Sequence, residues 1–374
     1  MKTIIGLLTA LLIMHTLVVA QDTVPNSNFV KEKKPFQFSF IYPLGTNGIN
    51  SPKYSNDFSL NLLGGVNGGV NACEIGAFAN INHGDVFGFQ AAGFTNVNIG
   101  NATCFQVAGF YNQNKAFNGG QFAGFLNTNL GHSAGMMVAG FANIIHGNTI
   151  GWQVAGFVNS NTKETDGAQF AGFANVSKDI NGVQLAGFIN VAQKVKGVQL
   201  GFINVADSVD GVSIGFLSIV KKGYNRIELG VNESLYGNLT FKIGTEHFYN
   251  IFTGGFKQAH FDNYWSYGYG IGSAFSVLPK MSLNMDIMSQ QINENRWETE
   301  KINLLNTFRI NASFKFAKHL ELAAGPTFNV FVSEFDQKEG IGTTSNFVPY
   351  CFYDQVYDKY SIQMYVGFNA AIRF

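Results

Sequence analysis

Gln153-Val154-Ala155-Gly156-Phe157-Val158-Asn159 is the stretch that decides the fold, because the frame Gln-x-Ala-Gly-Phe-x-Asn returns at residues 169–175 and 184–190. Its phenylalanine recurs every 14 to 16 residues, at Phe78, Phe94, Phe110, Phe125, Phe141, Phe157, Phe173, Phe188, Phe202 and Phe216. An asparagine follows two residues later, at Asn80, Asn96, Asn112, Asn127, Asn143, Asn159, Asn175, Asn190 and Asn204, and Ser218 replaces it in the last copy. Such regularity over about 140 residues indicates structural repeats that pack on one another.

Side chains within one copy alternate between two faces, as they do in a β-strand: Val183, Leu185 and Ile189 fall on one face, and Gln184 and Asn190 on the other. We expect a β-solenoid, in which equivalent phenylalanines stack and equivalent asparagine and glutamine amides hydrogen-bond along the stack. The alternative is one large up-and-down β-barrel with a hairpin per period. Its strands of about seven residues would be shorter than the roughly 9 to 11 that a tilted membrane strand needs.

The segments on both sides of the repeat alternate apolar and polar residues over longer runs. In the last one, the apolar positions are Met364, Val366, Phe368, Ala370, Ile372 and Phe374. Residues 36–42, 239–244, 281–287 and 308–316 follow the same pattern. One run extends from Tyr264 to Val277, and aromatic residues gather near the ends of runs, at Tyr264, Trp265, Tyr267, Tyr350, Phe352, Tyr353 and Tyr360. These features predict an antiparallel, outer-membrane-type β-barrel of about eight to ten strands.

The final strand, Tyr365 to Phe374, resembles the terminal strand of Gram-negative outer-membrane barrel proteins, which commonly ends in an aromatic residue read by the barrel assembly machinery. The resemblance covers residues 35–70 and 225–374 and makes Phe374 the expected terminal signal. The middle of the chain is similar to the Ala-Gly-Phe-x-Asn surface repeats of uncharacterised Gram-negative envelope proteins. The resemblance therefore implies a location in the outer membrane and no particular activity.

The N-terminus predicts export. Lys2 precedes an apolar run from Ile4 to Val19, and small residues end at Ala20, where signal peptidase would cleave. We therefore divide the chain into a signal peptide (1–20), a linker (21–34), N-terminal barrel strands (35–70), a repeat module (71–222) and C-terminal barrel strands (223–374). The abundance of glycine and phenylalanine, 43 and 37 residues, with only 13% charged residues, suits strands whose faces meet lipid or each other.

Residue patterns for chemistry are sparse. The formal net charge is zero and no basic patch stands out, so a nucleic-acid partner is not expected. The three cysteines and seven histidines lack metal-ligand spacing, and we expect no metal, no cofactor and no catalytic residue. His319, with Glu321 and Asp286, is the one set that a hydrolase hypothesis can nominate, and a structural polar network is the favoured interpretation of these side chains.

Two functional classes follow from these patterns. The favoured one is a non-enzymatic outer-membrane or surface protein that is embedded in the lipid bilayer and presents rows of Gln, Asn and Phe to a glycan or protein ligand. The alternative is a porin-like channel or transporter, whose lumen would carry Lys242, Asp286, Arg309, Lys315 and Arg373.

Overall fold

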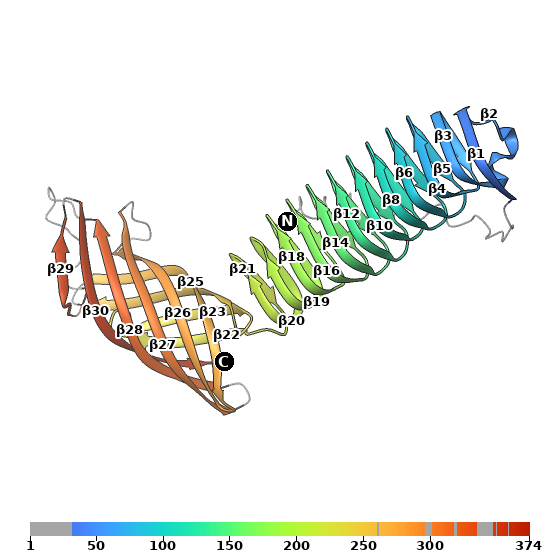
Figure 1. Ribbon diagram of the computed structural model, residues 1–374. Coiled ribbons are helices and arrows are strands. Elements are labelled where there is room, and N and C mark those ends of the chain that lie inside the picture. Colours follow the sequence, from blue (N-terminus) through green and yellow to red (C-terminus); the bar gives the residue numbers. More distant parts are fainter. Residues whose placement is uncertain are drawn as a thin grey trace.

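The computed structural model describes residues 32–259, 262–295, 301–317, 320–334, 347–348, 350–357 and 359–374. These residues form two β-sheets that follow one another along the chain (Figure 1). The predicted signal peptide and most of the predicted linker lie outside the described residues, and residues 32–34 of that linker already belong to the first strand. In the described ranges, no helix combines the length and the apolar character needed to cross a bilayer.

The first sheet is a parallel β-solenoid, as the repeat predicts. Each strand pairs in register with the equivalent strands of the coils before and after it, so that Gln153 lies beside Met137 and Gln169. The long strands are β1 (Glu32–Ile41), β3 (Tyr54–Asn67), β4 (Gly69–Gly76), β6 (Val86–Ala92), β8 (Ala102–Ala108), β10 (Phe117–Ala123), β12 (Ser133–Ala139), β14 (Thr149–Ala155), β16 (Glu164–Ala171) and β18 (Asp179–Ala186).

From β6 to β18, a Gly-Phe turn leads from each long strand to the short-strand segment of the same coil, and Ala77-Phe78 takes this place after β4. The short strands are β5 (Ala79–Asn82), β7 (Thr95–Asn98), β9 (Tyr111–Asn114), β11 (Leu126–Asn129), β13 (Ala142–Ile145), β15 (Val158–Asn161), β17 (Ala174–Val176) and β21 (Leu217–Val220). In β19 (Ile189–Leu200) and β20 (Ile203–Ile214), one continuous strand serves as the short strand of one coil and the long strand of the next. At the N-terminal end, β2 (Leu44–Gly45) and the 3-10 helix η1 (Gly48–Lys53) lie beside β1 and β3.

Glycines let the coils approach one another closely. A column of glycines with positive φ runs through the long strands, and Gly151 has φ of 122°. A Cβ atom at Gly151 would overlap the carbonyl oxygen of Gly135 in the preceding coil. Glycine is therefore required at this position both by the backbone conformation and by the space between coils.

The assignment of residues 35–70 to the barrel is wrong. Strands β1 and β3 pair in parallel, β3 pairs in parallel with β4, and all three belong to the solenoid sheet. The solenoid thus begins at Glu32 rather than at residue 71, and it ends at Val220, close to the predicted boundary. The prediction was wrong because a solenoid with a polar interior produces the same alternation as a membrane strand. In β1, exposed Phe36, Phe38 and Phe40 alternate with buried Gln37 and Ser39.

The second sheet is antiparallel and its pairings return to their starting strand. Neighbouring strands pair in chain order from β22 to β28, β28 pairs with β30, and β30 pairs back with β22, while β29 adds to one end of β30. The strands are β22 (Arg226–Asn232), β23 (Gly237–Gly244), β24 (Tyr249–Ala259), β25 (Asp262–Leu278), β26 (Met281–Glu294), β27 (Asn303–Ala317), β28 (Leu320–Glu334), β29 (Tyr353–Val356) and β30 (Tyr360–Arg373).

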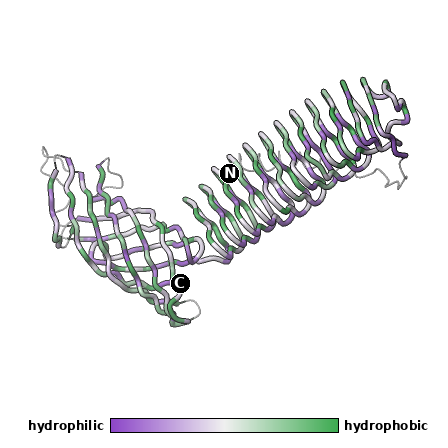
Figure 2. The backbone as a smooth tube through the Cα atoms, viewed as in Figure 1, coloured by the Kyte–Doolittle hydropathy of each residue, from purple (hydrophilic) through white to green (hydrophobic). Residues whose placement is uncertain are grey.

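Both sheets place many polar side chains inside and large apolar side chains outside, and each interior also holds buried apolar clusters. In the second sheet the inward positions include Lys242, Asp286 and Arg309, all buried, whereas outward residues such as Ile287 (58% exposed) and Phe241 (41%) face the surroundings. Figure 2 shows the resulting mixture of hydrophobic and hydrophilic residues along single strands. The alternation predicted for the C-terminal segments is confirmed.

Candidate functional site

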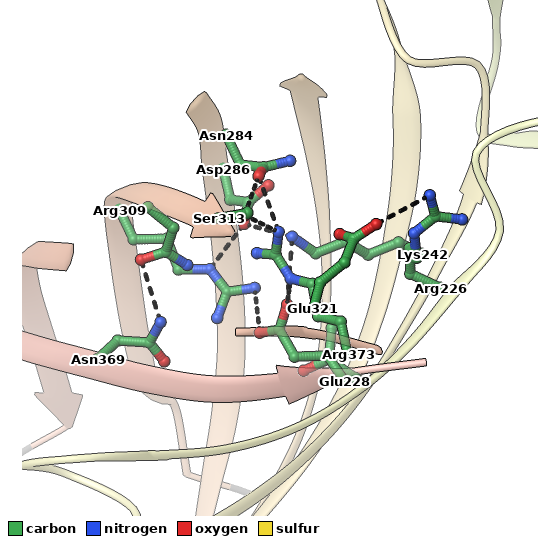
Figure 3. Close-up of polar contacts among 12 residues, drawn as sticks. Arg226, Glu228, Lys242, Asn284, Asp286, Arg309, Ser313, Glu321, Asn369 and Arg373 are labelled. Atoms are coloured by element: carbon green, nitrogen blue, oxygen red, sulfur yellow. Dashed lines mark hydrogen bonds and ion pairs between the residues drawn. The ribbon is translucent and has the colours of Figure 1, made fainter. Parts of the chain in front are cut away.

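Five charged side chains from five different strands meet inside the closed sheet (Figure 3). They are Glu228 of β22, Lys242 of β23, Asp286 of β26, Arg309 of β27 and Arg373 of β30, and each side chain is at most 4% exposed. Each of them occupies an inward position of a strand whose neighbouring residues point outward, so the strand period of two brings all five into one cluster. We call this group the charge cluster.

The charge cluster is densely paired. Lys242 lies 2.8 Å from Asp286 and 3.4 Å from Glu228, and Arg309 contacts the same two carboxylates at 2.7 and 2.9 Å. Arg373 contacts Glu228 at 2.6 Å. The two carboxylates thus bridge three cations, which satisfies the requirement that buried charges be paired.

Uncharged groups complete the network. The Tyr249 hydroxyl donates to Asp286 at 2.7 Å, and Arg373 donates to Asn284 at 2.7 Å and to Ser313 at 2.5 Å. Because these side chains are committed to one another across the ring, the cluster ties opposite strands together. Its arrangement is that of a structural network, without a nucleophile paired with a base.

Four of the five lumen charges predicted for the channel alternative lie in this cluster. Lys315 does not: it keeps the inward register of β27, but it lies near the strand end, where it is exposed and outside the buried network. Glu228 was missed in the sequence analysis. This residue stands between the apolar residues Ile227 and Leu229 in β22, and that alternation also indicates an inward-facing polar side chain.

The other end of the closed sheet is filled by apolar side chains. Phe347, Tyr264, Phe331 and Tyr365 are buried in one cluster with Leu235, Ile292, Leu305 and Val348. The ammonium group of Lys257 donates to the Phe347 carbonyl at 2.7 Å and lies over that ring. Tyr264, which we expected near a strand end at a membrane interface, therefore points into the interior instead.

Inside the solenoid, asparagine amides form a continuous ladder, and glutamine amides form a second one that is interrupted at Met137. Asn143 donates to Asn159 at 2.8 Å and Asn159 donates to Asn175 at 2.9 Å, and the same bond links the other asparagines from Asn80 to Asn204. The second proton of each amide satisfies a main-chain carbonyl, as in the bond from Asn143 to Val154 at 2.9 Å. A parallel ladder joins the glutamines, for example Gln184 to Gln169 at 2.7 Å.

Glu74 begins the glutamine ladder at the N-terminal end of the solenoid. Its two carboxylate oxygens accept four amide bonds, from Asn61, Asn67, Asn82 and Gln90, at 2.6 to 3.0 Å. Burial raises the pKa of the Glu74 carboxyl above its ordinary value, and these four hydrogen bonds partly oppose that rise. Burial, reinforced by the negative charge of Glu74, also raises the pKa of the nearby Cys104 thiol to about 12.

The expectation that Gln and Asn rows face a ligand is wrong, because the ladder amides from Asn80 to Asn204 and from Gln90 to Gln199 are fully buried. The phenylalanines are instead on the outside. Their rings stack coil on coil with centroids 4.7 to 5.9 Å apart, from Phe78 to Phe216. Phe78 is 52% exposed and Phe216 is 49% exposed. We call this the phenylalanine row.

The outer wall of the antiparallel sheet caps the last coil of the solenoid. Asn250 accepts a bond from the Ser218 amide and donates to the Gly215 carbonyl, both at 2.8 Å. The ring of Tyr269 stacks on Phe216 at 4.9 Å, and its hydroxyl donates to the Phe216 carbonyl. The closed sheet therefore continues both the polar contacts and the phenylalanine row of the solenoid.

Metal-ligating side chains do not gather in the described residues. No group of three or more His, Cys, Asp or Glu side chains with a geometry for a metal ion occurs there. Cys73, Cys104 and Cys351 are free. His319, the one histidine nominated for hydrolysis, lies outside the described residues, and its expected partner Glu321 pairs with Arg226 at 3.3 Å.

Comparison of the chain with protein-family models, with curated proteins and with solved structures finds no match.

Proposed function

We propose that this chain is a non-enzymatic outer-membrane protein in which the closed antiparallel sheet is a membrane-spanning barrel and the solenoid is a rigid arm attached to it. The observation that carries the proposal is the inverted polarity of the closed sheet. Its interior holds the charge cluster, and its outer wall exposes Phe241, Ile287 and Phe328 at 41 to 58%. Burying charge while exposing large apolar side chains is unfavourable in water and favourable when the wall faces hydrocarbon.

Strand length supports the same assignment. Five strands of the closed sheet, β25 to β28 and β30, contain 14 to 17 residues. A tilted strand needs about 9 to 11 residues to cross a bilayer. These strands can therefore span it and project beyond it.

The connections between strands give the barrel an orientation. The longest ones, residues 295–302 between β26 and β27 and residues 335–359 between β28 and β30, leave the rim opposite the solenoid. The connections at the solenoid rim, residues 245–248, 279–280 and 318–319, are two to four residues long. Short turns on the periplasmic side and longer loops outside are the rule for such barrels, so we place the solenoid in the periplasm.

The filled interior favours an anchor over a channel. The charge cluster closes one end of the ring, and the apolar cluster around Phe347 fills the other. A ring of eight strands leaves only enough room for side chains or one small ligand. We therefore expect no stable open level in planar-bilayer recordings of the purified protein, and a reproducible unitary conductance would favour the porin-like alternative.

A matched pair of substitutions tests the membrane assignment. Ile287 (58% exposed) lies in the middle of β26, whereas Leu278 (61% exposed) is the last residue of β25. In lipid, Ile287→Lys should destabilise the barrel by about 2–4 kcal/mol and Leu278→Lys by about 0–1 kcal/mol, because the penalty depends on depth. The measurement is the fraction of heat-modifiable, membrane-bound protein on gels. Equal behaviour of the two variants, or recovery of the wild type as a soluble periplasmic protein, would contradict the proposal.

A further inference from the structure

The outer face of the long solenoid strands is apolar from one end of the solenoid to the other. Two adjacent outward columns contain no charged side chain and no amide or hydroxyl group. The first is Phe58, Cys73, Phe89, Phe105, Gly120, Met136, Trp152, Ala168, Val183, Val198 and Val212. The second is Leu60, Ile75, Ala91, Val107, Phe122, Val138, Val154, Phe170, Leu185, Leu200 and Ile214. Together with the adjoining phenylalanine row, we call this surface the apolar face.

The apolar face lies outside the solenoid interior, which is filled by the buried amide ladders together with a separate set of buried apolar side chains such as Val86 and Phe117. Several of its side chains are largely accessible: Trp152 is 58% exposed, Phe58 is 55% exposed and Phe105 is 47% exposed. Monomeric soluble proteins rarely expose a contiguous apolar patch of more than a few hundred square ångströms. We therefore infer that another molecule covers this apolar surface, which extends over eleven successive strand positions.

The composition of the apolar face favours hydrocarbon over a protein partner. Protein interfaces carry about one hydrogen bond per 100–200 Å², and their rims are polar. In the two central columns, the indole N–H of Trp152 is the one strong side-chain hydrogen-bonding group. In the column before them, charged residues occur at Lys34 at the far end of the solenoid and at Asp166, Lys196 and Asp210 in the coils nearest the closed sheet. One column earlier, Glu164, Asp179 and Lys194 add further charges in those same coils.

The contact between the solenoid and the closed sheet favours the surrounding bilayer as that hydrocarbon. The phenylalanine row continues from Phe216 onto Tyr269, and Tyr269 packs edge-on against Phe252 with ring centroids 5.5 Å apart. Tyr269 and Phe252 belong to the outer wall that we assign to the bilayer. The aromatic edge of the apolar face is therefore continuous with a lipid-facing surface.

We propose that the apolar face rests on the periplasmic leaflet of the same outer membrane, with its aromatic side chains at the boundary between headgroups and acyl chains. This inference rests on the proposed function, because the barrel brings the solenoid to that leaflet. The solenoid is then a membrane-lying arm, whose opposite, short-strand face is directed toward the periplasm.

Trp152 is a native probe of the apolar face. The chain has three tryptophans, and the variant Trp265→Phe/Trp297→Phe leaves Trp152 as the only one. The full chain is reconstituted in phosphatidylethanolamine–phosphatidylglycerol vesicles whose acyl chains carry bromine either near the headgroup or near the chain end. We expect quenching of Trp152 by both lipids, with the larger loss of emission from the bromine near the headgroup, and an emission maximum at shorter wavelength than in detergent.

Two single-tryptophan controls, each made with Trp152→Phe, complete the experiment. Gln113→Trp lies on the opposite, short-strand face and should not be quenched, whereas Ile287→Trp on the barrel wall should be quenched most strongly by the deep bromine. A heat-modifiable band verifies folding of each variant.

The outcomes separate the two proposals. Quenching at Ile287→Trp without quenching at Trp152 overturns the membrane-lying arm and leaves the barrel intact. Absence of quenching at both positions overturns both. A blue-shifted Trp152 that lipid bromine does not quench would mean that protein, such as a second copy of the chain, covers the apolar face, and it would also overturn the proposal.

Discussion

Met137 and Ile145 interrupt two amide ladders of the solenoid in the same coil. One is the glutamine ladder, and the other is a second asparagine ladder that links Asn82, Asn98, Asn114 and Asn129. Met137 stands between Gln121 and Gln153 in the glutamine ladder, and Ile145 stands where the neighbouring coil has Asn129. Both side chains are fully buried. In the preceding coil, Asn129 donates to Gln121 at 2.9 Å and Gln121 donates back at 3.3 Å, a cross-strand pair that Met137 and Ile145 replace with an apolar contact.

The interruption has a specific energetic signature. Gln153 has no acceptor for its buried Nε2 group, because the preceding glutamine is missing. The change Met137→Gln supplies that acceptor, but it places an amide against Ile145. The change Ile145→Asn continues the second ladder, but it leaves amide protons facing Met137. Each single variant should therefore lose the burial of a large apolar side chain, worth about 1.5–3 kcal/mol, and recover only part of it through the ladder.

The double variant Met137→Gln/Ile145→Asn rebuilds the cross-strand pair as well as both ladders. With two such hydrogen bonds at about 0.5–1.5 kcal/mol each, we expect a favourable coupling free energy of about 1–3 kcal/mol between the two substitutions. The assay is a double-mutant cycle on denaturant unfolding of the full chain, followed by Trp152 fluorescence with the other two tryptophans replaced. Additivity within about 0.5 kcal/mol would refute the argument that the ladders and their cross-strand bonds hold the interior together.

Three further substitutions test other parts of the structure. Gly151→Ala should destabilise the solenoid by more than the roughly 0.5–1 kcal/mol of an ordinary backbone effect, because the new Cβ would overlap a main-chain oxygen. Gly120→Ala is the control, since its Cβ would meet only phenylalanine rings that can move. The thermal midpoints of the two variants are compared. The pKa of Glu74 is raised in the folded chain, so its contribution to stability should be full below its ordinary pKa and should decline as pH rises through the raised value. Glu74→Gln should remove this pH dependence from thermal midpoints measured between acidic and neutral pH. Asp286→Asn should reduce the stability of the closed sheet by about 3–5 kcal/mol, because it leaves buried cations uncompensated. Its heat-modifiable band should therefore be lost at lower temperature, and an unchanged band would show that the charge cluster does not hold the ring together.

The solenoid was predictable because its signal is periodic. A parallel stack places equivalent residues in every coil, and the recurrence of Gly-Phe-x-Asn every 14 to 16 residues therefore indicates such a stack. The stacking of Phe157 on Phe141 and the bond from Asn143 to Asn159 follow from that register alone. The register does not show whether the phenylalanines or the amides face outward. Alternation assigns residues to two faces of a strand, but it does not say which face is buried.

The assignment of β1 and β3 failed for the same reason. Phe36, Phe38 and Phe40 alternate with polar residues just as Met364, Val366 and Phe368 do, although the first strand belongs to the solenoid and the second to the closed sheet. Both environments bury polar groups and expose apolar ones, so the local pattern is identical. The alternation also does not show where a strand leaves the packed interior. Lys315 keeps the inward register of β27, yet it lies near the strand end and outside the charge cluster.

The shared inversion also explains why the interiors hold extended polar networks. Where an apolar outer surface meets hydrocarbon, burying apolar side chains provides little net driving force, and packing and hydrogen bonds between strands must supply cohesion instead. The solenoid meets this need with amides that each bond two coils, and the closed sheet meets it with two carboxylates shared among three cations. If lipid covers both outer surfaces, disruption of a ladder or of the charge cluster should destabilise the protein more than truncation of an outward residue such as Phe105 or Phe241. In water the apolar contacts along the outer surface would contribute to cohesion, and the two kinds of change would have comparable effects.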